Sequence, residues 1–172
     1  MKIKTGIVLA AFVLGCAAGS SLAIAQSFLT VDNDVVGKEA PSFTLKTLSG
    51  EAVSLSKTRA GKKTILFFWA TWCPHCRAAL NAISQDPEQF ERKGIKFILV
   101  NLGETREIVQ RYAEKNNVKF PVFLDESSAL VDSYGLGGVP TFFFIDEKGI
   151  VQAVRYSLPE NYEEILSKGG QK

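Results

Sequence analysis

Two cysteines separated by only two residues are the part of the sequence best suited to chemistry. Cys73 and Cys76 lie in the segment Cys-Pro-His-Cys at residues 73–76. A pair this close in the chain cannot join distant parts of a fold, and the loop that it closes is too short for much structural benefit. It suits thiol–disulfide exchange, in which one thiolate attacks a disulfide and a second thiol resolves the mixed disulfide. We therefore predict a redox-active disulfide between Cys73 and Cys76, with no bound cofactor.

The residues around the pair predict how it is positioned. Residues 64–69 form an apolar run typical of a buried strand, and residues 74–85 have helical character. Cys73 would then precede the first turn of a helix, where unpaired backbone N–H groups and the helix dipole favour the thiolate. Pro74 suits a first-turn position, because no intrahelical hydrogen bond is lost there.

His75 is the only histidine of the chain and lies between the two cysteines. Its imidazole would stabilise a Cys73 thiolate further and make the disulfide more oxidising. The alternative is an exposed histidine without a role. We favour the tuning role because of the position between the two sulfurs.

Metal and haem sites fit the motif poorly. A structural zinc site needs four ligands, and the sequence has no second cysteine pair to supply them. Covalent haem attachment needs a histidine directly after the second cysteine, but Arg77 occupies that position. We expect no metal.

The N-terminus indicates export. Lys2 and Lys4 precede an uncharged, mostly apolar run at residues 6–25, which ends in Ala-Ile-Ala. This pattern predicts a signal peptide or membrane anchor at residues 1–25. Three outcomes compete: cleavage after Ala25, retention as an anchor, or lipidation of Cys16. In each case the protein is extracytoplasmic, either in the periplasm or on the outer face of the cytoplasmic membrane.

The charge balance excludes one class of partner. The chain has a formal net charge of +2, with 20 basic and 18 acidic residues. Lys2 and Lys4 account for the excess, so the rest of the chain is neutral. A nucleic-acid-binding protein needs a clustered basic surface, and we expect no nucleic-acid partner.

The remaining pattern predicts one α/β domain at residues 37–172 after a linker at residues 26–36. Early strands alternate with helices, which favours a parallel core, and a late hairpin adds antiparallel strands. The fold is thus expected to be a mixed central sheet flanked by helices. The expected strands are at residues 42–45, 52–55, 64–69, 95–101, 121–124, 141–145 and 150–154, and the expected helices at 74–85, 104–115, 128–134 and 159–167.

Two segments carry a family resemblance. Residues 69–76 read Trp-Ala-Thr-Trp-Cys-Pro-His-Cys, and residues 138–141 read Gly-Val-Pro-Thr. They resemble the TlpA/ResA group of thioredoxin-like proteins, extracytoplasmic thiol–disulfide oxidoreductases of the redoxin or AhpC/TSA-like superfamily. The resemblance covers residues 37 to about 165. It implies a thioredoxin fold with an N-terminal β-hairpin around residues 40–45 and a central αβ insertion at residues 100–125.

The resemblance also implies partners and roles. Several members of the group reduce apocytochrome c before haem attachment, so the expected partners are exported proteins with thiols or disulfides, apocytochrome c among them, and a membrane donor of thiol reductant. Cys73 would be the attacking thiol and Cys76 the resolving thiol. A cis Pro140 would leave the backbone of Val139 free to pair with an extended substrate, and Trp72 would contact the substrate beside it.

The sequence departs from related proteins where an acid is expected. Thioredoxins carry a buried Asp on the strand before the motif, and this chain has Phe67 there. Many ResA-like reductases carry a Glu three residues after the second cysteine, and here it is Ala79. Glu104 matches a family position near the active site and is the candidate acid or base for Cys76. Alternatively, Glu104 is a helix N-terminal acid that interacts with the dipole.

The favoured function is a protein-disulfide reductase or relay. A disulfide oxidase of the DsbA type shares the Cys-Pro-His-Cys arrangement, but its large helical insertion does not fit in this chain. A peroxiredoxin-like antioxidant protein shares the hairpin start at residues 40–45, although Ala70 stands where peroxidatic cysteines usually have a Thr three residues earlier. A binding domain with an inert disulfide is the non-enzymatic alternative.

Overall fold

The most apolar runs of the sequence become the central strands of a mixed sheet. The computed structural model describes residues 32–167. Within them, β3 (Lys63–Trp69) and β4 (Ile95–Leu102) lie side by side and parallel. Both are covered on their two faces, which explains why their sequences are almost continuously apolar. The predicted strands at residues 64–69 and 95–101 are confirmed.

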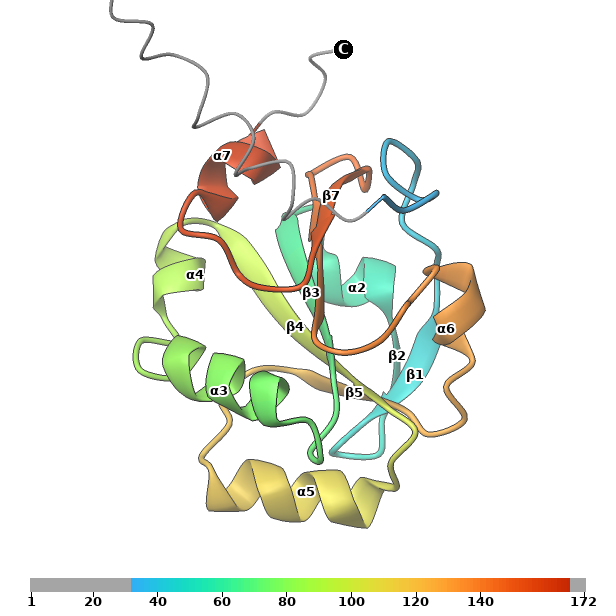
Figure 1. Ribbon diagram of the computed structural model, residues 1–172, viewed down its shortest axis with the longest axis vertical. Coiled ribbons are helices and arrows are strands. Elements are labelled where there is room, and N and C mark those ends of the chain that lie inside the picture. Colours follow the sequence, from blue (N-terminus) through green and yellow to red (C-terminus); the bar gives the residue numbers. More distant parts are fainter. Residues whose placement is uncertain (1–31, 168–172) are drawn as a thin grey trace, which may run out of the picture.

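Seven strands form this sheet in the order β2-β1-β5-β4-β3-β6-β7 (Figure 1). Strands β3, β4 and β5 are parallel to one another, whereas β1 is antiparallel to β5 and β6 is antiparallel to β3. The mixed α/β sheet of a thioredoxin-like fold is therefore confirmed. The outer strands are β1 (Thr44–Thr47), β2 (Ala52–Ser54), β5 (Val122–Asp125), β6 (Thr141–Ile145) and β7 (Val151–Arg155).

Six helices among the described residues cover the sheet. They are α2 (Leu55–Arg59), α3 (Pro74–Ile83), α4 (Gln89–Arg92), α5 (Arg106–Lys115), α6 (Leu130–Ser133) and α7 (Tyr162–Ser167). Successive side chains of β3 point to opposite faces, so its buried residues divide between two cores. Phe67 and Trp69 pack in the core under α3, α4, α5 and α7. Leu66 and Phe68 pack in the core under α2 and α6.

Several boundaries differ from the expectation; for example, α3 ends at Ile83 and α5 begins at Arg106. Two of the differences have a clear local cause. The strand expected at residues 52–55 ends at Ser54, because the Ser54 side chain accepts a hydrogen bond from the Lys57 backbone N–H and begins α2. The closing helix starts at Tyr162 and not at Pro159, whose carbonyl instead accepts the Tyr162 N–H in a preceding turn.

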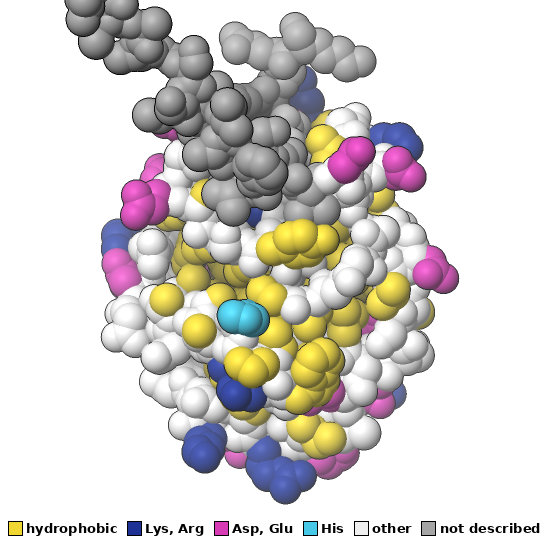
Figure 2. Space-filling view, in the orientation of Figure 1, with side chains coloured by type: hydrophobic (Ala, Val, Ile, Leu, Met, Phe, Trp, Pro, Cys, Tyr) yellow, Lys and Arg dark blue, Asp and Glu magenta, His cyan; other side chains and the backbone are white. Residues whose placement is uncertain are grey.

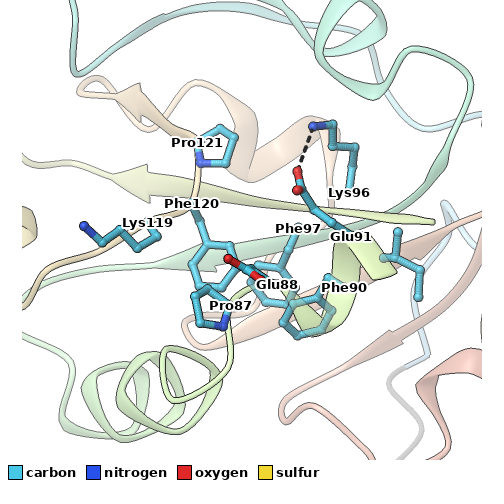
Figure 3. Close-up of a pocket in the computed structure, with 10 residues that line it drawn as sticks. Pro87, Glu88, Phe90, Glu91, Lys96, Phe97, Lys119, Phe120 and Pro121 are labelled. Carbon is cyan, nitrogen blue, oxygen red and sulfur yellow. Dashed lines mark ion pairs between the residues drawn. The ribbon is translucent and has the colours of Figure 1, made fainter. Parts of the chain in front are cut away.

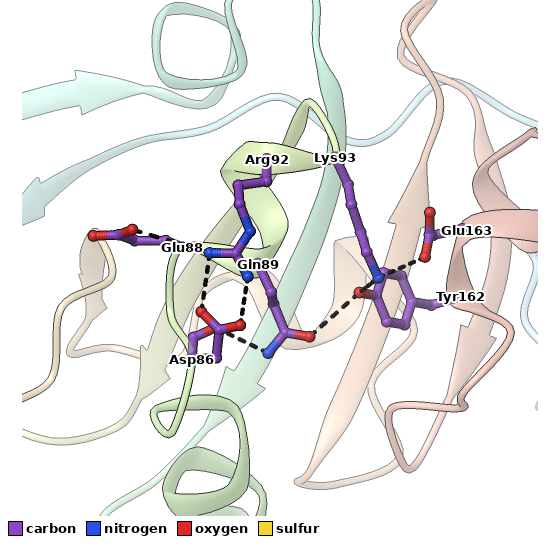
Figure 4. Close-up of polar contacts among 7 residues, drawn as sticks. All are labelled: Asp86, Glu88, Gln89, Arg92, Lys93, Tyr162 and Glu163. Atoms are coloured by element: carbon purple, nitrogen blue, oxygen red, sulfur yellow. Dashed lines mark hydrogen bonds and ion pairs between the residues drawn. The ribbon is translucent and has the colours of Figure 1, made fainter.

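Polar contacts join α4 to α7 on the surface (Figure 4). The Lys93 ammonium lies 2.6 Å from a Glu163 carboxylate oxygen and donates to the Tyr162 hydroxyl at 2.7 Å. Exposed ion pairs of this kind contribute little to stability. The buried side chains of Tyr162 and Leu166 therefore hold α7 on the sheet.

A pocket of about 450 Å³ opens where α4 meets the start of β4 and the loop before β5 (Figure 3). The rings of Phe90, Phe97 and Phe120 form its floor, with ring centroids of Phe97 and Phe120 5.0 Å apart. These aromatic contacts close one end of the core that lies under α3, α4, α5 and α7. This end lies away from the C-terminal ends of the parallel strands.

The first described residues are tied to the domain. Asn33 donates from its side chain to the carbonyls of Tyr134 and Gly135, at 2.9 and 3.1 Å. The Gly37 N–H then donates to the Val151 carbonyl at 2.8 Å. The predicted signal peptide or anchor at residues 1–25 lies outside the described residues, as does most of the predicted linker.

Between residues 32 and 167, no helix combines the length and the apolar character that crossing a bilayer requires.

Candidate active site

The redox pair lies where the central strand gives way to a helix. β3 ends at Trp69, a turn closes with the Cys73 N–H donating to the Ala70 carbonyl, and α3 begins at Pro74. Cys73 is the N-cap residue of α3, and Pro74 occupies the first turn as expected. Cys73 and Cys76 form a disulfide, with their Cα atoms 5.2 Å apart.

The two cysteines differ in access. The exposed fraction of Cys73 is 3 %, whereas Cys76 is fully buried. The Cys76 backbone N–H donates to the Cys73 Sγ at 3.2 Å. An N–H group aimed at this sulfur at the positive end of a helix stabilises a thiolate there, so Cys73 is the sulfur equipped to attack.

The loop before β6 lies against the Cys73 sulfur. The Val139–Pro140 peptide bond is cis. The Val139 carbonyl oxygen is 3.7 Å from the Cys73 Sγ, and the Thr141 hydroxyl donates to the Gly138 carbonyl at 2.7 Å. The structure thus brings Val139 and Pro140 to the redox pair from a position more than 60 residues away in the sequence.

Two grooves border the redox pair, and no charged side chain lines either of them. Trp72 and Val139 line one groove, which reaches the loops after β4 and α6. His75 and Pro140 line the other, which continues to Tyr156 and Leu158. Figure 2 shows the single histidine on this face with apolar side chains gathered around it. Trp72 and His75 are both exposed, so each can touch a docked protein.

Glu104 is buried, with an exposed fraction of 7 %. It precedes Thr105, the N-cap of α5, and therefore lies outside the first turn in which a dipole role was considered. Its carboxylate accepts the Thr71 N–H at 2.7 Å, the Thr71 hydroxyl, and the Asn101 side-chain N–H at 2.7 Å. Glu104 thus reaches the turn that carries Cys73, and the described hydrogen bonds do not link it to either sulfur.

Thr71, Asn101 and Arg77 were not expected at the site. The Arg77 guanidinium donates to the Thr71 carbonyl at 3.0 Å, opposite the Glu104 contacts. Asn101 offered one signal in the sequence, since it is a polar residue at the end of an otherwise apolar strand. Thr71 and Arg77 offered none beyond their closeness to the pair.

Apolar residues, Phe67 and Ala79, occupy the two positions at which related proteins carry an acid. The Phe67 ring stacks on the Phe142 ring of β6, with centroids 4.1 Å apart and planes 9° from parallel. Ala79 lines the groove beside His75. Residues 32–167 contain no group of three or more histidine, cysteine or acidic side chains that could hold a metal ion.

Known proteins are similar to this chain in sequence and fold. The family model described as AhpC/TSA family matches residues 36–154. The thiol-disulfide oxidoreductase ResA of Bacillus subtilis (strain 168) is 32% identical over 160 residues, which cover 92% of this chain and 87% of ResA. ResA of Bacillus anthracis is 33% identical over 135 residues, covering 77% of this chain and 78% of that protein.

Solved structures agree with these relatives. StoA from Bacillus subtilis superimposes with a TM-score of 0.60 at 28% identity, covering 74% of this chain and 96% of StoA. A thiol:disulfide interchange protein of the thioredoxin family from Chlorobium tepidum TLS gives 0.64 at 27% identity, covering 80% and 97%. The family match, the ResA relatives and the disulfide at the N-terminus of α3 agree on one assignment. The chain belongs to the AhpC/TSA family, and it is a thiol–disulfide oxidoreductase with a thioredoxin-like fold.

Proposed function

We propose that this oxidoreductase works outside the cytoplasm, as a reductant or relay that exchanges disulfides with exported proteins through Cys73 and Cys76. The observation that carries the proposal is the Cys76 N–H aimed at the Cys73 sulfur, which lies beside the Val139 carbonyl. The predicted signal peptide or anchor at residues 1–25 supports the location. Apocytochrome c is the proposed substrate, and a membrane donor of thiol reductant would reload the pair.

The proposed reaction begins with the reduced pair. The Cys73 thiolate attacks one sulfur of a partner disulfide, and the other partner sulfur leaves as a thiolate. The Cys76 thiol then loses its proton and attacks the Cys73 sulfur, which breaks the mixed disulfide. The partner leaves with two thiols, having gained two electrons and two protons, and the enzyme keeps the disulfide. A dithiol donor returns the enzyme to its reduced form.

Substrate contact would use the surfaces that border the pair. An extended segment of the partner would pair with the Val139 backbone, next to the cis Pro140, and would rest on Trp72. The grooves have no charged lining, so segments with apolar residues around the cysteine would dock best. Glu104 remains our proposed acid or base for Cys76, and its burial beside the Cys73 turn supports the assignment.

Trapping partners in the exporting cell tests this proposal. A Cys76→Ser variant cannot resolve the mixed disulfide, so exported partners should stay attached to Cys73 and be identified by mass spectrometry. A Cys73→Ser, Cys76→Ser double variant is the matched control and should trap nothing. Failure of the single variant to trap any exported protein would contradict the proposal, and recovery of apocytochrome c would support the proposed substrate.

A peroxiredoxin-like activity is the second candidate, because the AhpC/TSA family model matches the chain. Ala70 weakens it, since this position lacks a hydroxyl and is fully buried three residues before Cys73. A peroxide-consumption assay decides between them. Rapid turnover by a Cys76→Ala variant supplied with a thiol would favour the peroxidase.

A further inference from the structure

Thr71 lies two residues before Cys73, and side chains from two other segments hold all of its polar groups. Its N–H donates to Glu104 Oε2 at 2.7 Å and its hydroxyl donates to Glu104 Oε1. On the other side, its carbonyl accepts from Arg77 Nη1 at 3.0 Å. Glu104 comes from the turn before α5, and Arg77 from the first turn of α3.

The sheet supports this arrangement from below. The buried Asn101 side chain donates to Glu104 Oε2 at 2.7 Å. Asn101 is on β4, directly opposite Trp69, the last residue of β3. The carboxylate therefore joins the end of β4 to the turn that follows β3. Hydrogen bonds to an ionised carboxylate are stronger than those between neutral groups, and burial excludes competing water.

We propose that Thr71 is a positioning residue for the reaction: held between Glu104 and Arg77, it keeps Cys73 at the N-cap of α3. The N-cap position is what aims the Cys76 N–H at the Cys73 sulfur. Loosening Thr71 would let Cys73 move off the helix terminus and would weaken the stabilisation of its thiolate. The proposal concerns the same pair as the proposed function, but it depends on neither the direction of electron flow nor the partner.

This role differs from that of an acid or base. Both Glu104 oxygens accept hydrogen bonds from Thr71, so Glu104 acts on Cys73 through the turn. If Glu104 served only to take a proton from Cys76, removal of the Thr71 hydroxyl would leave the thiolate of Cys73 unchanged.

The test uses the reduced full-length protein with Thr71→Val, which keeps the shape of the side chain and removes the hydroxyl. Alkylation by iodoacetamide is followed against pH on the peptide that carries Cys73, by mass spectrometry. We expect the midpoint of this pH profile, at which half of the maximal alkylation rate of Cys73 is reached, to rise by roughly half a pH unit. This is the size of a helix-terminus interaction. Because the thiolate is less stabilised, the reduction potential of the pair, measured against glutathione, should become more negative.

Two variants separate positioning from general damage. Thr71→Ser restores the hydroxyl and should restore the wild-type midpoint. Thr47→Val removes a hydroxyl that bonds within the β1–β2 hairpin and should leave the midpoint unchanged. A wild-type midpoint and potential in Thr71→Val would overturn the proposal, as would a Thr71→Ser variant shifted as far as Thr71→Val.

Arg77→Lys covers the case in which Thr71→Val does not fold. It keeps the positive charge and removes the guanidinium that reaches the Thr71 carbonyl, so a raised midpoint reports positioning and not charge. An unchanged midpoint there would overturn the proposal. No partner protein takes part in these measurements, so their failure is distinct from a failure of partner trapping.

Discussion

The backbone N–H of Cys76 points at the sulfur of Cys73, with 3.2 Å between the nitrogen and Sγ. In our proposal one residue thus supplies both the resolving thiol and the N–H donor that stabilises the attacking thiolate. Cys76 is fully buried and Cys73 keeps an exposed fraction of 3 %, and this small difference in access agrees with our proposal that Cys73 attacks and Cys76 resolves.

In the reduced protein, Cys73 should react with iodoacetamide at least about tenfold faster than Cys76 near neutral pH, because thiolate character and access both favour it. Peptide mapping after brief alkylation measures the two rates. Unfolding in denaturant should make the two alkylation rates similar. Faster labelling of Cys76 in the folded protein would reverse the assignment of attacking and resolving thiols.

His75→Ser should make the reduction potential of the pair more negative by on the order of 30 mV, because the imidazole no longer stabilises the Cys73 thiolate. Equilibration with glutathione buffers gives the potential. Ala78→Ser alters another exposed residue of α3 and should leave the potential unchanged. An unaltered or more positive potential in His75→Ser would assign the histidine no tuning role.

Tyr156→Ala should raise the KM for a protein disulfide substrate about fivefold with little change in kcat, as expected for the loss of about 1 kcal/mol of contact energy. Tyr156 is 54 % exposed and lines the groove beside His75 and Pro140. Ile108→Ala, an exposed apolar residue on α5 outside both grooves, is the control. Equal effects of the two variants would count against docking in the groove.

Burial raises the pKa of Tyr134 far above its ordinary value, with the nearby Arg59 opposing the shift. The hydroxyl donates to the Pro41 carbonyl at 2.6 Å. Tyrosine in the unfolded chain ionises near pH 10, so the free energy of unfolding should be at its full value below about pH 10 and fall as the pH rises further. Urea unfolding at a series of pH values measures this.

Tyr134→Phe provides the matched comparison. It should lower the free energy of unfolding by about 1 kcal/mol at neutral pH, because a buried hydrogen bond is lost and the Pro41 carbonyl keeps no donor. At alkaline pH, the free energy of unfolding of this variant should fall less steeply than that of the wild type. Identical alkaline behaviour of the two proteins would mean that other groups cause the fall.

The sequence predicted what depends on local pattern. The apolar runs at residues 64–69 and 95–101 are typical of buried strands, and the motif placed Cys73 before a helix. The contact between Thr71 and Glu104 joins residues 33 apart, and that between Asn33 and Tyr134 joins residues 101 apart. Such pairs follow from how the strands are ordered in the sheet, which no local pattern encodes.

Local competition explains two of the differences. The segment at residues 52–55 alternates like a strand, but Ser54 is both the last paired residue of β2 and the N-cap of α2, so Leu55 begins the helix. Glu104 had the sequence position of a first-turn acid, yet Thr105 became the N-cap and the carboxylate was left free to turn toward Thr71. The later start of α5, at Arg106 and not at residue 104, thus places Glu104 outside the first turn in which it would interact with the helix dipole.

If the predicted anchor at residues 1–25 is retained, the hydrogen bonds of Asn33 to the segment after α6 would set the orientation of the domain. Figure 1 shows the first described residues in the upper half of the molecule and the C-terminal end of β3, where the redox pair follows, in the lower half. A domain held at residue 32 would therefore present its thiols away from its point of attachment. A partner would therefore reach the redox pair at a distance from the point of attachment.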